Sequence, residues 1–192
     1  YPLAYIATKI SLGKNLTELR NMVTKSTSAC FEPSLDYCVI KFPRWDNQKF
    51  TNSSNTIGSC MKSIGEIMSI GRTFEEAFMK GLRMMNDDIV NLIDTLPYLK
   101  KMDDDRLKEE IGKPTDKRIF AILEGFTRNY TVKLIGKLTK INLWYLTKMK
   151  NLVNMEKQMG VCPYLTEDEL ALYKKNGFSD KQIGQRFKHK ED

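Results

Sequence analysis

The side chains best suited to bind a metal or act in catalysis are four cysteines and one histidine. Their spacing argues against a metal site. The cysteines stand at positions 30, 38, 60 and 162, so no two of them form the CxxC pair of a zinc knuckle. The single histidine, His189, lies in a charged tail, so a catalytic Ser/His/Asp or Cys/His arrangement is not expected. We therefore predict free, mostly buried thiols and no bound metal.

Two further groups of residues could bind ions. Gly71-Arg72-Thr73 precedes a predicted helix, where backbone N–H groups and the arginine could hold an anion, but ordinary helix capping explains the same residues. Residues 58–63 lack the second glycine and the GKS or GKT ending of a P-loop. The aspartates at 87–88 and 103–105 could hold a cation or act as an acid/base pair, but their polar surroundings favour a solvated linker. The sequence predicts no catalytic, cofactor-binding or metal-binding residue.

Length and composition are typical of an ordinary globular protein, with 192 residues, 41% of them hydrophobic and 29% charged. The net charge of +7 is uneven: residues 1–96 hold 11 Lys/Arg and 10 Asp/Glu, and residues 97–192 hold 20 and 14. A basic half can bind nucleic acid or an acidic partner, although a solvated lysine-rich surface is the simpler interpretation. No apolar run approaches the ~18 residues of a membrane span and no signal peptide is visible, so we expect a cytoplasmic protein.

The elements that must position these residues begin with two predicted helices. Residues 2–12 place apolar side chains on one helical face, and Gly13 is a suitable stop. Asn15, with Glu18 three residues later, has the pattern of a capping box at the start of a short helix.

Strands and an amphipathic helix follow. Residues 35–42 are rich in β-branched and aromatic side chains and predict a strand that Pro43 ends, while residues 64–71 predict a second strand. Thr73 and Glu76 predict another capping box. The apolar side chains of the helix after it are Phe74, Ala77, Phe78, Leu82 and Met85.

The second half of the chain has the pattern of a small helical bundle. Residues 86–116 are highly charged and contain Pro97 and Pro114, so we place a domain junction there. Beyond it a helix begins at Thr115 or Asp116. The expected starts of the later helices are Thr131, Asn142, Thr166 and Ser179, and the expected ends of the third and fourth helices are Gly160 and Asn176-Gly177. The apolar residues expected inward are Ile119, Phe120, Ile122, Leu123, Phe126, Ile135, Leu138, Leu143, Leu146, Met149, Leu152, Val153, Met159, Ile183 and Phe187.

Residues 166–187 resemble the first two helices of a helix-turn-helix unit. A DNA-reading unit needs a recognition helix with side chains that reach base edges, and here a charged tail follows instead. A capped helix pair is an equally good packing unit. A helical module that binds nucleic acid or a protein partner is therefore the alternative function, and nucleic-acid binding is not expected.

Several stretches resemble the large subunit of carbamoyl phosphate synthetase, in matching order and spacing over nearly the whole chain. The most specific are ACFEPSLDY at 29–37 and MKSIGEIM at 61–68. Shorter matching stretches are YPLA at 1–4, KFPRWD at 41–46, IGRTFEE at 70–76, LT at 138–139, LWYL at 143–146 and GFSDKQI at 177–183. The resemblance thins in residues 86–116.

The resemblance implies the fold and the place of this chain in a longer one. The family's large chain has two similar ATP-grasp halves with a helical oligomerisation domain between them. The expected fold is thus an α+β segment, the end of an ATP-grasp domain, followed by an all-α oligomerisation domain, predominantly α in total. Residues 1–95 would be the C-terminal part of the first, carboxyphosphate domain, 96–116 a connection, and 117–192 a truncated oligomerisation domain.

The resemblance also implies a structural role within an enzyme. The parent would be an ATP-dependent ligase that makes carbamoyl phosphate from bicarbonate, glutamine-derived ammonia and ATP, with Mg or Mn. The family's metal- and phosphate-binding residues precede the position of Tyr1, so none is carried over and this fragment would be inactive. Expected partners are the rest of the synthetase chain, a glutaminase subunit or domain and a second copy of the helical domain, without nucleic acid or membrane. The abundance of Lys, Asn and Ile suggests an AT-rich coding sequence, which favours a microbial eukaryote that makes pyrimidines.

Overall fold

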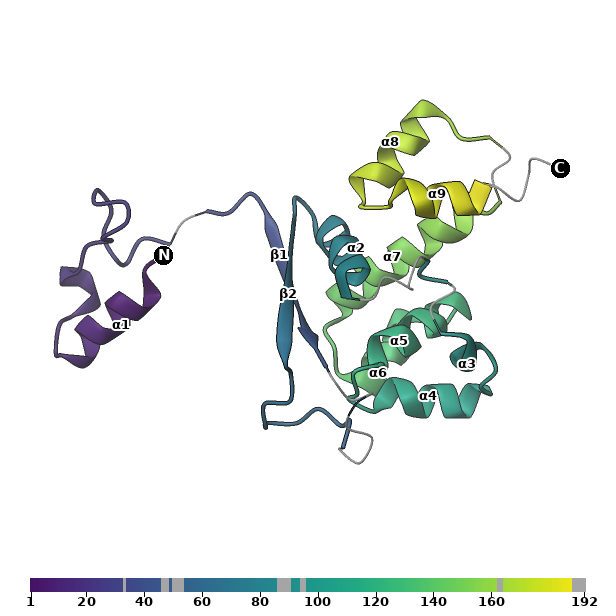
Figure 1. Ribbon diagram of the computed structural model, residues 1–192, viewed down its shortest axis with the longest axis horizontal. Helices are drawn as coiled ribbons and strands as arrows, with labels where there is room; N and C mark the ends of the chain where they lie inside the picture. The colour runs from purple at the N-terminus through teal and green to yellow at the C-terminus, as the bar shows by residue number, and fades with distance from the viewer. Residues whose placement is uncertain are drawn as a thin grey trace. The chain divides into compact units, whose positions relative to one another are not determined.

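The computed structural model describes residues 1–32, 34–45, 49, 54–85, 91–93, 96–161 and 164–187. The chain forms two compact units, Tyr1–Asp36 and Tyr37–Asp192 (Figure 1). The described residues are mostly helical, with nine α-helices, one 3-10 helix and one two-stranded sheet. The expectation of a predominantly α chain is therefore confirmed.

The unit Tyr1–Asp36 contains helix α1, Leu3–Ser11, and a 3-10 helix at Leu16–Glu18. Gly13 follows α1 with φ +86°, a conformation that glycine adopts without steric cost. The capping box predicted at Asn15 is wrong. The Asn15 side chain caps no backbone N–H and instead donates from Nδ2 to Glu18 Oε1 (2.9 Å). The Glu18 amide that a capping box would use donates to the Asn15 carbonyl (3.1 Å) in the 3-10 helix.

The second unit begins with an antiparallel sheet of β1, Cys38–Arg44, and β2, Gly65–Gly71, in which Ile40 pairs with Ser69. The prediction that Pro43 ends the strand is wrong, since Pro43 lies inside β1 opposite Glu66. The register gives the reason. The Ile70 carbonyl points to the outer edge of β2, where Lys80 binds it, so Ile70 and its partner Val39 are a pair without hydrogen bonds to each other. Such pairs alternate along an antiparallel sheet, and Pro43–Glu66 is another of them, with the backbone groups of both residues pointing away from the opposite strand. The missing N–H of Pro43 therefore costs no inter-strand hydrogen bond.

Helix α2, Phe74–Met85, covers one face of this sheet. Phe42 and Phe78 are buried there with ring centroids 5.7 Å apart. Gly81 allows the close approach, because a Cβ at this position would run into the Phe42 ring. Among the apolar residues predicted inward, Ala77, Phe78 and Leu82 are buried, and Phe74 and Met85 are partly buried against the core.

Seven helices complete the second unit. Two of them lie in the range 96–116 that the sequence analysis expected as a connection, and the other five lie close to predicted helices. They are α3, Pro97–Lys100; α4, Asp104–Gly112; α5, Arg118–Thr127; α6, Val132–Thr139; α7, Leu143–Met159; α8, Glu167–Lys175; and α9, Asp180–Phe187. The caps at Thr131, Asn142 and Thr166 are confirmed, with side chains that accept from Leu134, Trp144 and Glu169 N–H groups. The start predicted for α5, Thr115 or Asp116, comes before the observed start at Arg118. The reason is that residues 115–117 form a turn in which Arg118 N donates to Thr115 O.

A single hydrophobic core joins the sheet, α2 and the later helices. Its fully buried members include Phe126 of α5, Ile135 of α6, and Leu146 and Val153 of α7. Leu143, predicted inward, is 46% exposed because it lies in the first turn of α7, at the edge of the core. The range 96–116, expected as a connection, contains α3 and α4, whose Leu99, Leu107 and Ile111 are buried; the division into domains stays a prediction.

Within the described ranges, every helix is too short or too polar to cross a membrane.

Candidate functional site

The start of α2 is the place where the sequence allowed an anion, and the structure shows a cap. Thr73 Oγ1 accepts from Glu76 N (3.2 Å), and Glu76 Oε2 accepts from Arg72 N (2.7 Å). Lys80 Nζ donates to the other carboxylate oxygen of Glu76, and this bond together with the Arg72 amide lowers the pKa of Glu76. The Glu76 carboxylate holds the Arg72 amide and the Thr73 hydroxyl holds the Glu76 amide, so the predicted cap is present.

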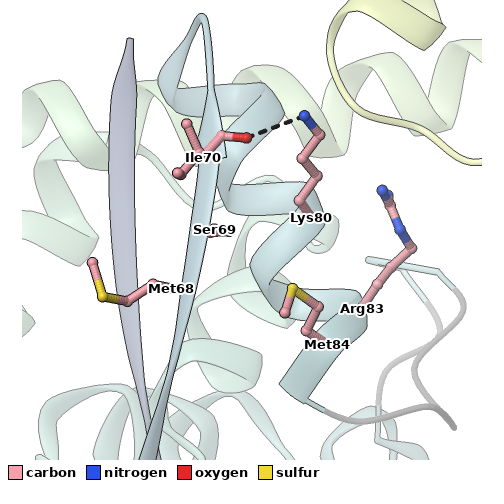
Figure 2. A pocket seen from close by; sticks show the side chains of 6 residues that line it. All are labelled: Met68, Ser69, Ile70, Lys80, Arg83 and Met84. Carbon is pink, nitrogen blue, oxygen red and sulfur yellow. Dashed lines mark hydrogen bonds between the residues drawn. The ribbon is translucent and has the colours of Figure 1, made fainter. Parts of the chain in front are cut away.

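A hollow of about 510 Å³ lies beside this cap, between the outer edge of β2 and α2 (Figure 2). Its lining residues are Met68, Ser69, Ile70, Lys80, Arg83 and Met84. Lys80 reaches across its upper end, and its Nζ donates to the Ile70 carbonyl (3.1 Å). The lining contains no carboxylate, histidine or thiol that could act as an acid, base or nucleophile. A lysine on an edge carbonyl is instead a device that protects an open strand from pairing with another chain.

Arg83 of α2 joins this region to the turn between α8 and α9. Its guanidinium donates to Gly177 O and to Gln182 Oε1, and burial lowers the pKa of Arg83. Gly177 has φ +91°, and a Cβ there would lie 2.9 Å from the Cβ of Met79. The turn therefore packs directly on α2 with no room for a side chain.

The pair of α8 and α9 is a packing unit. Both predicted caps are present: Thr166 with Glu169, and Ser179, whose amide donates to Gln182 Oε1 (2.8 Å) while its hydroxyl accepts from Gln182 N (3.2 Å). Apolar side chains of the pair pack inside the unit, where Tyr173 and Phe178 pack edge to face and Ile183 is buried.

A buried carboxylate ties α9 to α7. Glu156 is 1% exposed and accepts from the Leu92 amide (2.8 Å) and from Arg186 Nε (3.0 Å) and Nη2 (2.5 Å). Burial raises the pKa of Glu156, and the Arg186 hydrogen bonds oppose that rise. The sequence analysis missed this pair. The available signal was Glu156 at helical spacing between the apolar Val153 and Met159, but nothing local points to a partner in another helix.

The aspartates at 103–105 begin a helix, so the linker predicted for them is wrong, although all three side chains are exposed to solvent as predicted. Asp103 caps α4 by accepting from Arg106 N (2.8 Å), and Asp104 accepts from Arg128 Nη1 (3.0 Å). Hydrogen bonds from Tyr130 and Arg128 lower the pKa of Asp104. The aspartates at 87–88 lie outside the described residues.

The three described cysteines differ in burial. Cys30 and Cys60 are exposed and Cys38 is half-buried, so the prediction of mostly buried thiols is wrong for the first two. Cys162 and His189 lie outside the described residues. In the part of the chain that the structure describes, no group of three or more His, Cys, Asp or Glu side chains could hold a metal ion. That the chain carries no catalytic, cofactor-binding or metal-binding residue stays a prediction.

Several basic side chains of the second half bind the carbonyls at helix ends. Arg118 donates to the carbonyls of Ile111 (2.9 Å) and Thr139 (3.2 Å), and Lys157 donates to the Thr127 carbonyl (2.7 Å). Such contacts satisfy carbonyls that have no partner within their own helix, and a cation there is favoured by the helix dipole. The basic half is thus more than a solvated lysine-rich surface.

The class of protein defined by these features is a helical structural module built onto a small sheet, whose polar side chains are used mainly for capping and cross-linking. Comparison with known families agrees. Residues 66–192 match the sequence profile of the carbamoyl-phosphate synthetase large chain, oligomerisation domain. The chain belongs to this family.

The similarity to curated relatives extends beyond the profile to nearly the whole chain. Over 186 residues, 95% of the chain, it is 49% identical to the human carbamoyl-phosphate synthase (ammonia), mitochondrial, and covers 12% of that protein. The chain is 49% identical to multifunctional protein CAD of Squalus acanthias and 45% identical to multifunctional protein pyr1-3 of Dictyostelium discoideum. Each of these two alignments covers 95% of this chain and 8% of the relative. The chain spans roughly a tenth of the length of these relatives.

Proposed function

We propose that the chain is a structural part of a carbamoyl phosphate synthetase, in which it backs the first active site and mediates subunit association. The observation that carries the proposal is the 49% identity over 95% of the chain, together with the match of residues 66–192 to the oligomerisation domain. The parent enzyme is an ATP-dependent ligase that uses ATP and Mg or Mn and takes ammonia from a glutaminase subunit or domain. Cytoplasmic pyrimidine synthesis is the proposed setting.

The sheet supports the assignment of the first 95 residues to the end of an ATP-grasp domain. A two-stranded sheet is marginal alone, and the face of β1 and β2 opposite α2 exposes Val39, Met68 and Ile70. Those side chains are 40%, 57% and 58% exposed. Exposed apolar groups on one face suit a sheet that packs against the preceding part of a larger domain.

Two measurements on the 192-residue chain test the proposal. Light scattering over a wide concentration range should show a mass that rises with concentration, because association is a mass-action equilibrium. ATP hydrolysis and tight nucleotide binding should both be absent. ATP turnover by the isolated chain, or a strict monomer for the chain and for the intact parent enzyme, would contradict the structural role.

A further inference from the structure

Residues 125–155 contain six lysines and arginines and not one aspartate or glutamate. Three of the six are used inside the fold. Arg128 binds Glu124 (2.9 Å), Lys148 binds Glu75 (2.9 Å), and Lys150 donates to the Tyr130 carbonyl (3.3 Å).

The other three, Lys133, Lys137 and Lys140, are all exposed. Within the ranges that the structure describes, no carboxylate pairs with any of them. Lys133 and Lys137 lie one turn apart on α6, and Lys140 follows at the end of the helix with φ +60°. Like charges at this spacing repel one another, so the row is unfavourable until an anionic group neutralises it.

An exposed aromatic surface adjoins this row. Gly136 of α6 packs against Leu143, which brings α6 beside the first turn of α7. Leu143, Trp144 and Tyr145 are 46%, 53% and 46% exposed. The rings are held in place rather than loose, since the Trp144 and Tyr145 rings lie 5.6 and 5.5 Å from the Phe74 ring. Rigid, exposed Trp and Tyr are the residues that most often dominate protein–protein binding.

We propose that these six residues, Lys133, Lys137, Lys140, Leu143, Trp144 and Tyr145, form a docking surface for an acidic helical segment of another protein chain. We name them the basic–aromatic surface. The lysines repeat at intervals of four and three residues, which is the repeat of one helix face, so carboxylates at the same interval on a partner helix can meet them. Apolar side chains of that helix would cover the rings.

The ring geometry favours a protein over a nucleic acid. Trp144 and Tyr145 pack edge to face, with an interplanar angle of 89° and centroids 5.0 Å apart. Lys148 Nζ lies over the Trp144 ring at 5.4 Å. Bases bind by stacking on open aromatic faces, and these contacts restrict access to the Trp144 faces. The surface also lacks arginine, whose planar guanidinium is the preferred partner of phosphates.

The test uses the 192-residue chain and an alanine-based helical peptide with glutamates at i, i+4 and i+7 and leucines beside them. The matched peptide has glutamine at each glutamate. In a Trp45→Phe background, Trp144 is the only remaining tryptophan, so its fluorescence reports directly on the surface. We expect the glutamate peptide to bind and the glutamine peptide not to bind. Raising salt from about 20 to about 200 mM should weaken binding.

The triple variant Lys133→Gln/Lys137→Gln/Lys140→Gln should weaken glutamate-peptide binding about tenfold or more, because it removes every unpaired cation of the surface. The control variant Lys14→Gln/Lys175→Gln/Lys181→Gln removes the same charge from exposed lysines elsewhere and should bind like the parent chain. Circular dichroism checks that all variants are folded. Equal weakening in both triples, or no binding at low salt, overturns the proposal. So does a single-stranded RNA that binds more tightly than the peptide with the same dependence on the three lysines.

Discussion

The two units of the chain bury their apolar side chains to very different degrees. In Tyr1–Asp36 the buried apolar residues are Ile6 and Ala29, while Leu3, Leu12 and Val23 are 70%, 75% and 73% exposed. In Tyr37–Asp192 a continuous core extends from Phe42 to Ile183. A segment of 36 residues cannot bury enough apolar surface to offset the entropy of ordering its own chain. The first unit therefore has little core to stabilise it, whereas the second has a core of its own.

The largest expected effect is Phe126→Ala in the second unit. Phe126 is fully buried in α5, so truncation removes its transfer free energy and leaves a cavity, lowering the free energy of unfolding by about 3–5 kcal/mol. Urea unfolding followed by circular dichroism measures the change. A loss as small as that of an exposed substitution would mean that the core is not continuous, and the contrast between the two units would fail.

Arg186→Met should have the next largest effect, about 3 kcal/mol near neutral pH, because it leaves the Glu156 carboxylate buried without its cation. Burial raises the pKa of Glu156, so the folded state binds this proton more tightly than the unfolded state, and the group's contribution improves as pH falls toward its ordinary value of 4.5. The deficit of the variant should therefore shrink between about pH 7 and about pH 5.

Lys174→Met is the matched control for the Arg186 prediction. Lys174 pairs with Asp180 in the same helix pair (2.8 Å), but both side chains are exposed to solvent. No measurable loss of stability is expected, since exposed ion pairs are screened by water. A similar loss in both variants would show that burial of Glu156 is not what makes its pair matter.

Glu76→Gln should cost about 1 kcal/mol near neutral pH, because it weakens the cap of α2 and the bond to Lys80. The pKa of Glu76 is lower in the folded state than its ordinary value of 4.5, so its contribution is complete above that value and is lost as pH falls below it. The two stability curves should converge in acid. Glu18→Gln in the first unit, where Asn15 is its partner, should leave the main unfolding transition unchanged.

The smallest expected effect is in the first unit, and it tests most directly whether the two units differ in stability. Ile6→Ala, although Ile6 is only 2% exposed, should not shift the main thermal transition, and a chain of residues 37–192 should unfold at the same temperature as the full chain. Hydrogen exchange should show fast exchange throughout 1–36 and slow exchange in α5 and α7. A lower melting temperature after removal of 1–36 would mean that the first unit stabilises the second.

The sequence predicts the parts of this fold that depend on local signals. The starts of α2 and α6 and both ends of α7 and β2 follow from capping residues, stops and apolar periodicity, and the structure agrees with them to within one or two residues. Where the prediction fails, a distant contact decides. Pro43 stays in β1 because the register turns its nitrogen outward, and α4 forms in a charged stretch because Leu107 and Ile111 are buried against α5.

Sequence periodicity does not predict the hydrogen bonds and ion pairs that link different helices. Glu76 and Lys80 are four residues apart on one helix, so their contact can be read from spacing. Arg186 and Glu156 lie 30 residues apart on different helices, and Arg83 and Gly177 lie 94 apart. Nothing in the local sequence selects those partners. That no described carboxylate pairs with Lys133, Lys137 or Lys140 also cannot be read from the local sequence, since it depends on where the fold places the described acidic side chains.

The bond from Arg83 to the Gly177 carbonyl also sets an order of events during synthesis. Its two ends are separated by 94 residues, which take roughly 5–20 s to translate at typical rates. Isolated helices relax within about a microsecond, so α2 and the sheet emerge long before the turn that covers one side of α2. During that interval the nascent chain exposes the surface around Met79 and Arg83. We expect chaperones that bind nascent apolar segments to contact α2, and to leave once the turn at Gly177 has emerged.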